Sequence, residues 1–113
     1  MTDLGSFEQV PAEIPYAGID RRVLTTSKAT VQMYRFAPGA TFPLHHHAQE
    51  QITLVIEGDI AFSAGGERHE LSAGAWSVVP GDVPHGVTAG PAGARFVAII
   101  VPPRTDPPSA SDH

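Results

Sequence analysis

The sequence has no cysteine, few basic residues and no long hydrophobic run. Without cysteine, the chain can form no disulfide, thiolate metal site or cysteine nucleophile. Seven Lys and Arg against twelve Asp and Glu give a net charge of −5, and no basic cluster offsets this charge. No stretch reaches the roughly 18 apolar residues of a membrane span. We therefore expect neither nucleic acid nor a membrane as a partner, because phosphate binding needs a positive surface.

The opening stretch "MTDLGSFEQVPAE" carries early acids and no apolar segment, which argues against a secretory signal. A cytoplasmic protein is the expected default. With 113 residues, 42% of them hydrophobic, the chain suits one domain with one core.

Glycine and proline occur eleven times each and separate short segments rich in Val, Ile, Thr and Phe. No segment has a clean helical period, so the pattern predicts an all-β barrel or sandwich. The expected strands are 29–36, 51–57, 60–64, 68–72, 75–80, 85–89 and 94–101.

The chain divides into three predicted parts. Residues 1–20 form an N-terminal arm, which we expect to serve as an edge strand or as a strand exchanged with a partner. Residues 21–104 form the barrel. Residues 105–113 are rich in Pro, Ser and Asp, and this composition predicts a disordered tail.

The stretch "PLHHHAQEQ" (43–51) contains three consecutive histidines. On a strand, His45 and His47 point to one side and His46 to the other, so two imidazoles can face one ion. Gln51 keeps their parity unless a turn intervenes. His85, just after a Pro/Gly turn in "PGDVPHGV", is the best-placed further ligand. The cluster is too short and too internal for an affinity tag, but histidines without an ion remain an alternative.

Two motifs give the chain a resemblance to the cupin family. "GATFPLHHHAQEQITLVIEG" (39–58) resembles the first cupin motif, G-x5-H-x-H-x3-E-x6-G, with Gln51 in the glutamate position. "GAWSVVPGDVPH" (74–85) resembles the second, G-x5-P-x-G-x2-H, with Asp82 in the second glycine position. With the flanking strands, the resemblance covers roughly residues 20 to 104.

The resemblance implies a double-stranded β-helix, the cupin or jelly-roll barrel, with an ion near its mouth. The implied ligands of this ion are His45, His47, Gln51 and His85. We expect one divalent transition metal ion, for which imidazole and oxygen ligands allow Zn, Ni, Fe, Mn or Co. Because all four ligands are neutral, the ion keeps its full charge and is expected to attract anions as a strong Lewis acid.

Among small cupins, the chain most resembles those that ketonise unsaturated uronates in pectin and alginate breakdown, which also have glutamine at the position of Gln51. Pro102, Pro103, Arg104 and Asp106 match the end of their closing strand, and the resemblance implies an active-site role for Arg104. The carboxylate implied for proton transfer falls on Ala98, however. Losing such a group typically costs ~10²–10⁴-fold in rate.

Arg35 and Tyr34 join Arg104 as candidate catalytic groups. Arg35 or Arg104 could clamp a substrate carboxylate beside the metal. Arg35 shares parity with Val31 and Met33 and is expected to face either the barrel interior or a partner, with Tyr34 on the other side. The Tyr34 hydroxyl could be a general acid or a surface group.

These features favour a metal-dependent enzyme acting on a small anionic or enolisable molecule, as an isomerase, cyclase or lyase. A metal-dependent oxygenase and a non-catalytic small-molecule-binding barrel remain alternatives. The apolar face of Ile52, Leu54 and Ile56 predicts a homodimer.

Overall fold

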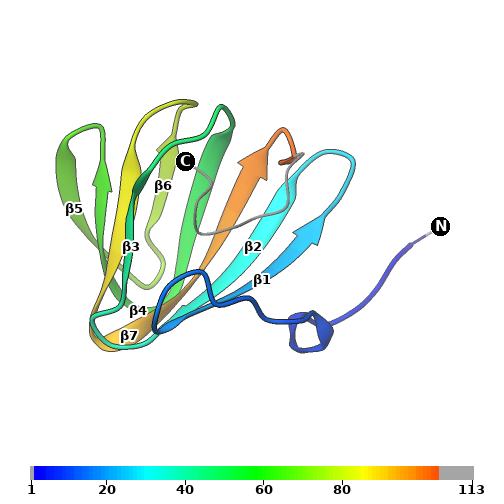
Figure 1. Cartoon of the computed structure of the whole chain (residues 1–113), viewed down its shortest axis with the longest axis horizontal. Coiled ribbons are helices and arrows are strands. Elements are labelled where there is room, and N and C mark those ends of the chain that lie inside the picture. Colours follow the sequence, from blue (N-terminus) through cyan, green and yellow to red (C-terminus); the bar gives the residue numbers. More distant parts are fainter. Residues whose placement is uncertain (1, 105–113) are drawn as a thin grey trace.

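The computed structural model describes residues 2–104, which fold into an antiparallel β-barrel (Figure 1). The predicted tail, residues 105–113, lies outside the described residues. Among residues 2–104, no helix has the length and hydrophobicity needed to cross a membrane. A short 3-10 helix, η1 (Phe7–Gln9), precedes seven strands: β1 (Ile19–Thr25), β2 (Thr30–Phe36), β3 (Thr41–His45), β4 (Glu50–Ala64), β5 (Glu67–Ser72), β6 (Trp76–Val79) and β7 (His85–Val101).

Two long strands connect the two halves of the barrel. One half has the strand order β1-β2-β7-β4-β6, and the other has β3-β7-β4-β5. Because β4 and β7 belong to both halves, each of them covers two strands that the sequence predicted separately. This arrangement confirms the predicted jelly-roll barrel.

Glycine permits the bend where the long strands pass between the halves. Gly58 has φ 74°, and Gly93 has φ 77°. A Cβ atom on Gly58 would clash with the carbonyl oxygen of Gly93. Only glycine fits this close backbone approach, and the register of β4 against β7 shifts on both sides of Gly58.

The inward sides of the core strands, such as β2, are buried between the two halves. On β2, Thr30, Gln32, Tyr34 and Phe36 are buried, whereas the outward Arg35 is exposed. This alternation follows the two-residue period of a strand. The inward side chains of β2 therefore change from polar at Thr30 to aromatic at Phe36.

The N-terminal segment lies along the edge of β1. The Arg22 guanidinium donates from Nη1 to the carbonyl oxygens of Phe7, Glu8 and Val10, at 3.0, 3.0 and 3.2 Å. Glu13 and Arg21 exchange two backbone hydrogen bonds of 2.8 Å each. In the described chain, the arm thus pairs with the edge strand of its own barrel.

Candidate metal centre

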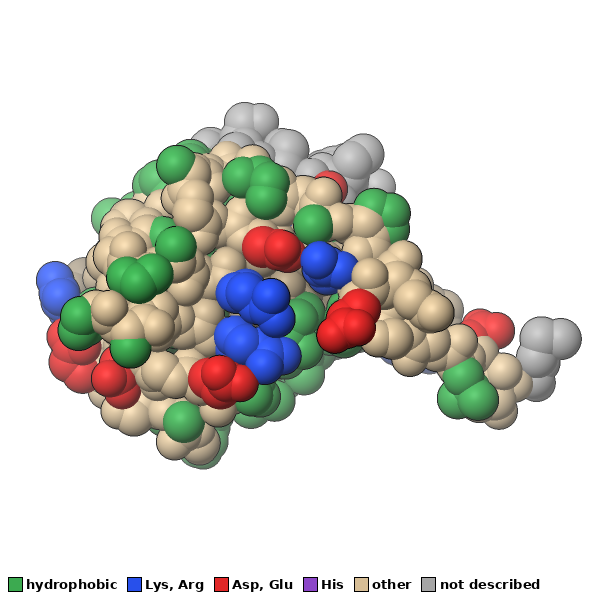
Figure 2. Space-filling view, turned by 90° about the horizontal axis from the view of Figure 1, so that it is seen from below, with side chains coloured by type: hydrophobic (Ala, Val, Ile, Leu, Met, Phe, Trp, Pro, Cys, Tyr) green, Lys and Arg blue, Asp and Glu red, His purple; other side chains and the backbone are tan. Residues whose placement is uncertain are grey.

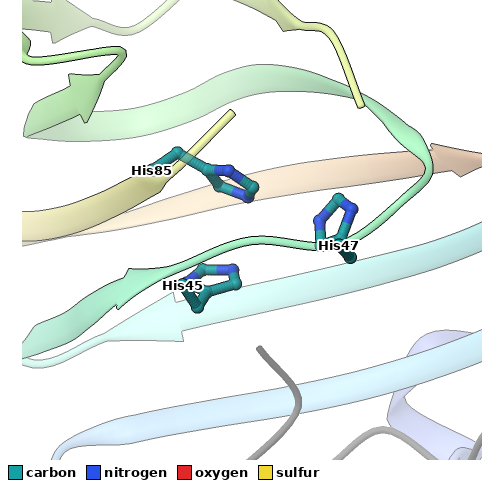
Figure 3. Close-up of side chains that lie close together, drawn as sticks. All are labelled: His45, His47 and His85. Atoms are coloured by element: carbon teal, nitrogen blue, oxygen red, sulfur yellow. The ribbon is translucent and has the colours of Figure 1, made fainter. Parts of the chain in front are cut away.

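Three histidines converge at one end of the barrel interior (Figure 3). His45 is the last residue of β3 and His85 the first residue of β7, and the two are cross-strand neighbours. His47 lies in the loop that follows β3. One ligand nitrogen from each ring lies within 4.8 Å of the other two. The sequence therefore placed His45 and His47 on one side correctly, although the strand ends between them.

The second motif fixes the loop that carries His47. The backbone amide of Asp82 donates to the carbonyl oxygen of His47 at 2.7 Å. Gly81 packs so closely against Ala48 that a Cβ atom would clash with the Ala48 carbonyl oxygen. Asp82 has φ 65°, which explains why the motif has glycine at this position. The turn that leads to His85 thus also positions His47.

Each imidazole is oriented by a backbone carbonyl. The Nδ1 atoms of the three rings contact carbonyl oxygens two residues away: His45 contacts Pro43 at 3.0 Å, His47 contacts Gln49 at 2.9 Å, and His85 contacts Val83 at 2.8 Å. A carbonyl only accepts, so each Nδ1 carries the proton and donates. In the neutral ring, Nε2 then bears the lone pair, as a metal ligand requires.

Gln51 directs an oxygen toward the same point. Its Nε2 donates to the Thr53 hydroxyl at 3.1 Å, which leaves Oε1 facing His47 Nε2, also at 3.1 Å. With the His47 proton on Nδ1, both facing atoms carry lone pairs and repel each other. A cation between them would remove this repulsion.

The buried environment favours the neutral form of His47 and His85. Burial, with a smaller effect of the Arg104 charge, lowers the pKa of His47 and of His85 below the usual histidine value. The Nε2 atom of His85 is buried and has no hydrogen-bond partner among residues 2–104. An unpartnered buried nitrogen is costly unless it binds something. The donor set and this orphaned atom fit a divalent transition metal ion.

The charge of Arg104, one of the predicted catalytic residues, acts to lower the pKa of His47, of His85 and of Tyr34. Its backbone amide donates to the Thr30 hydroxyl at 3.0 Å.

Tyr34 faces the interior and is linked to the histidines through an aromatic contact. Its hydroxyl donates to Gln32 Oε1 at 3.2 Å. Its ring centroid lies 6.1 Å from that of Phe42, which in turn lies 4.6 Å from that of His45. Burial raises the pKa of Tyr34, and the Arg21 guanidinium partly offsets this rise. Tyr34 is therefore a neutral phenol at neutral pH.

The structure places Arg35 outside the barrel, so it cannot clamp a substrate beside the histidines. It lies on the side of β2 opposite Tyr34, and strand register sets it between Asp20 and Arg95. Acidic and basic side chains gather on this underside of the molecule (Figure 2). A pocket of about 710 Å³ opens there, lined in part by Asp20, Arg35, Glu57 and Arg95.

The interior also contains residues that the sequence analysis missed. Arg21 is buried next to Tyr34, and Gln32 and Thr53 flank Ala98 in the strand register. Ala98 itself faces inward, at the position where the cupin resemblance implies a carboxylate. The strand β1 that carries Arg21 was not predicted, because its Asp-Arg-Arg run hides the alternation.

A cupin domain family model (Cupin_2) matches residues 32–100, and the chain therefore belongs to the cupin family. Dimethylsulfoniopropionate lyase DddW of Ruegeria pomeroyi is 39% identical over 61 residues, which are 54% of this chain and 40% of that protein. The match thus spans about two fifths of this relative's length.

Solved cupin structures cover nearly the whole chain. An RmlC-like cupin from Shewanella frigidimarina is 27% identical, with a TM-score of 0.84 over 94% of this chain and 96% of the other. KdgF from Halomonas sp. is also 27% identical, with a TM-score of 0.80 over 91% and 98% of the two chains. These similarities confirm the resemblance inferred from the two motifs.

Proposed function

We propose that this cupin binds one divalent transition metal ion through His45, His47, His85 and Gln51, and that it is an enzyme of the isomerase or lyase type. Its proposed substrate is a small carboxylate-bearing molecule that can enolise or eliminate. Two observations carry this proposal: one nitrogen from each of the three imidazoles converges, with each ring oriented by a backbone carbonyl, and the Gln51 oxygen faces His47.

When bound, the ion would act as a Lewis acid that polarises a substrate carbonyl or carboxylate. Zn, Ni, Fe, Mn and Co all suit these ligands. The ligand set contributes no negative charge, so an anionic substrate is attracted to the site. Arg104, whose charge acts on the pKa of His47 and His85, is proposed to bind the substrate carboxylate.

Tyr34 is the proposed proton donor. Its raised pKa keeps the phenol protonated, and its hydroxyl lies on the inward side of β2. Ala98 supplies no carboxylate, so proton transfer by an acid at this position is absent. The similarity to DddW, a dimethylsulfoniopropionate lyase, supports a lyase at least as well as a ketonising isomerase.

Elemental analysis tests the metal site. The purified wild type should carry close to one transition metal ion per chain after incubation with Zn, Ni, Mn or Fe salts. His47→Ala and Gln51→Ala should lose it, whereas His69→Ala, on the exposed strand β5, should retain it. A wild type that stays metal-free in all four salts would contradict the proposal and favour a metal-independent binding protein.

A turnover assay tests the reaction class. Metal-loaded protein should consume dimethylsulfoniopropionate or an unsaturated uronate, and Tyr34→Phe should lower the rate ~10²–10⁴-fold with unchanged metal content. Full activity in Tyr34→Phe would exclude the phenol as the proton donor. Consumption of oxygen during turnover would instead identify an oxygenase.

We also propose that the chain forms a homodimer through the outer face of β1, β2, β7, β4 and β6. Strand register aligns outward side chains of the five strands in two neighbouring rows of five. Nine of these ten side chains are apolar. The rows are Leu24, Val31, Ile99, Ile52 and Val78, then Arg22, Met33, Val97, Leu54 and Trp76.

An antiparallel sheet facing water usually has a polar outer side, and large exposed apolar patches mark interaction surfaces. Trp76 is 66% exposed and Leu54 38% exposed. The next row, Asp20, Arg35, Arg95 and Glu57, carries both charge signs, which suits a face that pairs with a copy of itself.

Light scattering tests the assembly. The wild type should have the mass of a dimer, and Trp76→Glu combined with Leu54→Glu should have the mass of a monomer. Arg68→Glu, on β5 of the other half, is the control and should remain dimeric. A monomeric wild type would refute this proposal.

A further inference from the structure

The guanidinium of Arg21 lies inside the barrel, where a cation is costly. Its side chain is only 3% exposed, and it neighbours Tyr34 in the strand register. A buried guanidinium requires an anionic partner, because the loss of hydration is otherwise uncompensated. Arg21 was not among the candidates from the sequence, and the mechanism proposed above does not use it.

The anionic partner of Arg21 comes from the N-terminal segment. Glu13 Oε1 lies 3.0 Å from Arg21 Nε, and the Glu13 side chain is 42% exposed. The two backbone hydrogen bonds between Glu13 and Arg21 hold this carboxylate in place. One member of the ion pair is thus buried in the interior, while the other is accessible from solvent and attached to a short arm.

This segment also contacts the wall of the metal centre. Tyr16 packs edge-on against Phe42, with ring centroids 4.9 Å apart, and Phe42 contacts His45. β1 pairs with β2 and with Glu13, whereas β3 pairs with β7. Residues 13–16 therefore connect the edge strands β1 and β3 beside the histidine end of the interior.

We propose that Arg21 is an anion-binding residue of the barrel interior, that Glu13 occupies it in the free protein, and that a substrate carboxylate takes the place of Glu13. The inference rests on the proposed function only in the class of substrate, a small carboxylate. The pair with Glu13 shows that the Arg21 guanidinium binds a carboxylate. Displacement of Glu13 would leave the backbone bridge to β1 intact.

The exchange also explains why Arg21 and Tyr34 are adjacent. The guanidinium is one of the groups that act on the pKa of Tyr34, together with Arg104 and Glu13. A carboxylate bound at Arg21 would therefore lie next to the phenol that is proposed to donate the proton. Arg104 and Arg21 would then both contribute positive charge to substrate binding.

Calorimetric titration with acetate and propanoate, in chelator-treated protein, tests the exchange without the metal. Removal of the competing carboxylate in Glu13→Gln should tighten binding of these anions at least tenfold, since a charged hydrogen bond contributes at least about 1.5 kcal/mol. Arg21→Gln should weaken binding by at least the same factor. Glu57→Gln, which removes the acid of the outward Arg95–Glu57 pair at 2.8 Å, is the matched control and should bind like the wild type.

Equal affinity of Glu13→Gln and Glu57→Gln would overturn the proposal and leave the ion pair with a role in closing the barrel edge. Arg21→Lys, which keeps the charge, covers the case in which Arg21→Gln does not fold, and it should bind more weakly than the wild type but respond to Glu13→Gln. Metal content measured in the same variants separates the two proposals, because failure of the anion site leaves metal binding unchanged.

Discussion

The two ends of the barrel interior are buried to the same degree but differ in chemistry. At the closed end, near the bend at Gly58 and Gly93, Phe36, Ile60 and Phe96 form an apolar core. At the histidine end, Thr53, Gln51 and His85 are equally hidden from solvent but polar. Apolar burial stabilises a fold, whereas buried polar groups cost free energy unless they are fully paired. The contrast supports a structural role for the closed end and the proposed binding role for the histidine end.

The largest effect on stability is expected at the closed end. Ile60→Ala leaves a cavity in the core, and such substitutions typically cost 2–5 kcal/mol of unfolding free energy. Urea denaturation followed by circular dichroism measures this loss. Metal content per folded chain should stay the same. If Ile60→Ala lost the metal but kept its stability, the division of roles between the two ends would be wrong.

A smaller effect, on metal affinity and not on stability, is expected for Thr53→Val at the histidine end. The substitution removes the acceptor that orients the Gln51 amide, and loss of such a supporting hydrogen bond typically weakens metal binding 10–100-fold. Competition with a chromophoric chelator measures the affinity. Thr53→Ser keeps the hydroxyl and should bind nearly as tightly as the wild type. Equal affinities in all three proteins would show that Gln51 is not held by Thr53.

The smallest expected effect is a pH dependence confined to the polar end. In the metal-free protein, burial lowers the pKa of His47 and His85 in the folded state, whereas the unfolded chain titrates near the usual value of about 6.5. As the pH falls below this value, the unfolded state takes up more protons, so stability should decrease from pH 7.5 to pH 5.

The slope of unfolding free energy against pH should be shallower in His85→Phe, which removes one of the two titrating groups, and unchanged in Ile60→Ala. Denaturant midpoints measured across this pH range provide the test. A wild-type stability that is flat over the range would contradict the assigned burial effect.

Local signals predicted part of the fold and of the histidine cluster. Turn residues and strand alternation indicated an all-β barrel or sandwich and put His45 and His47 on one side, whereas the resemblance to the two cupin motifs implied the jelly-roll barrel and the convergence with His85. Sequence alternation could not show that His47 lies in a loop. A continuous strand and the observed bend both put His45 and His47 on the same side. Alternation also left open which side of β2 faces inward, and the structure places Tyr34 inside and Arg35 outside.

The remaining features depend on contacts between distant segments. The strands predicted at 51–57 and 60–64 are one strand, β4. Gly58 bends the chain, and β4 pairs with β7 on both sides of this bend. The Arg21–Glu13 pair was invisible for a different reason. A charged residue normally indicates a solvent-facing position, and only tertiary packing reveals the exception.

The backbone carbonyls that hold the three imidazoles have a consequence for the evolution of this protein. Pro43, Gln49 and Val83 orient the rings through main-chain oxygens, which every amino acid possesses. Mutations at these three positions can change side-chain size and polarity without deleting an orienting acceptor. The geometry of the centre is therefore inherited with the shape of the chain, while the residues around it are free to diverge toward new substrates.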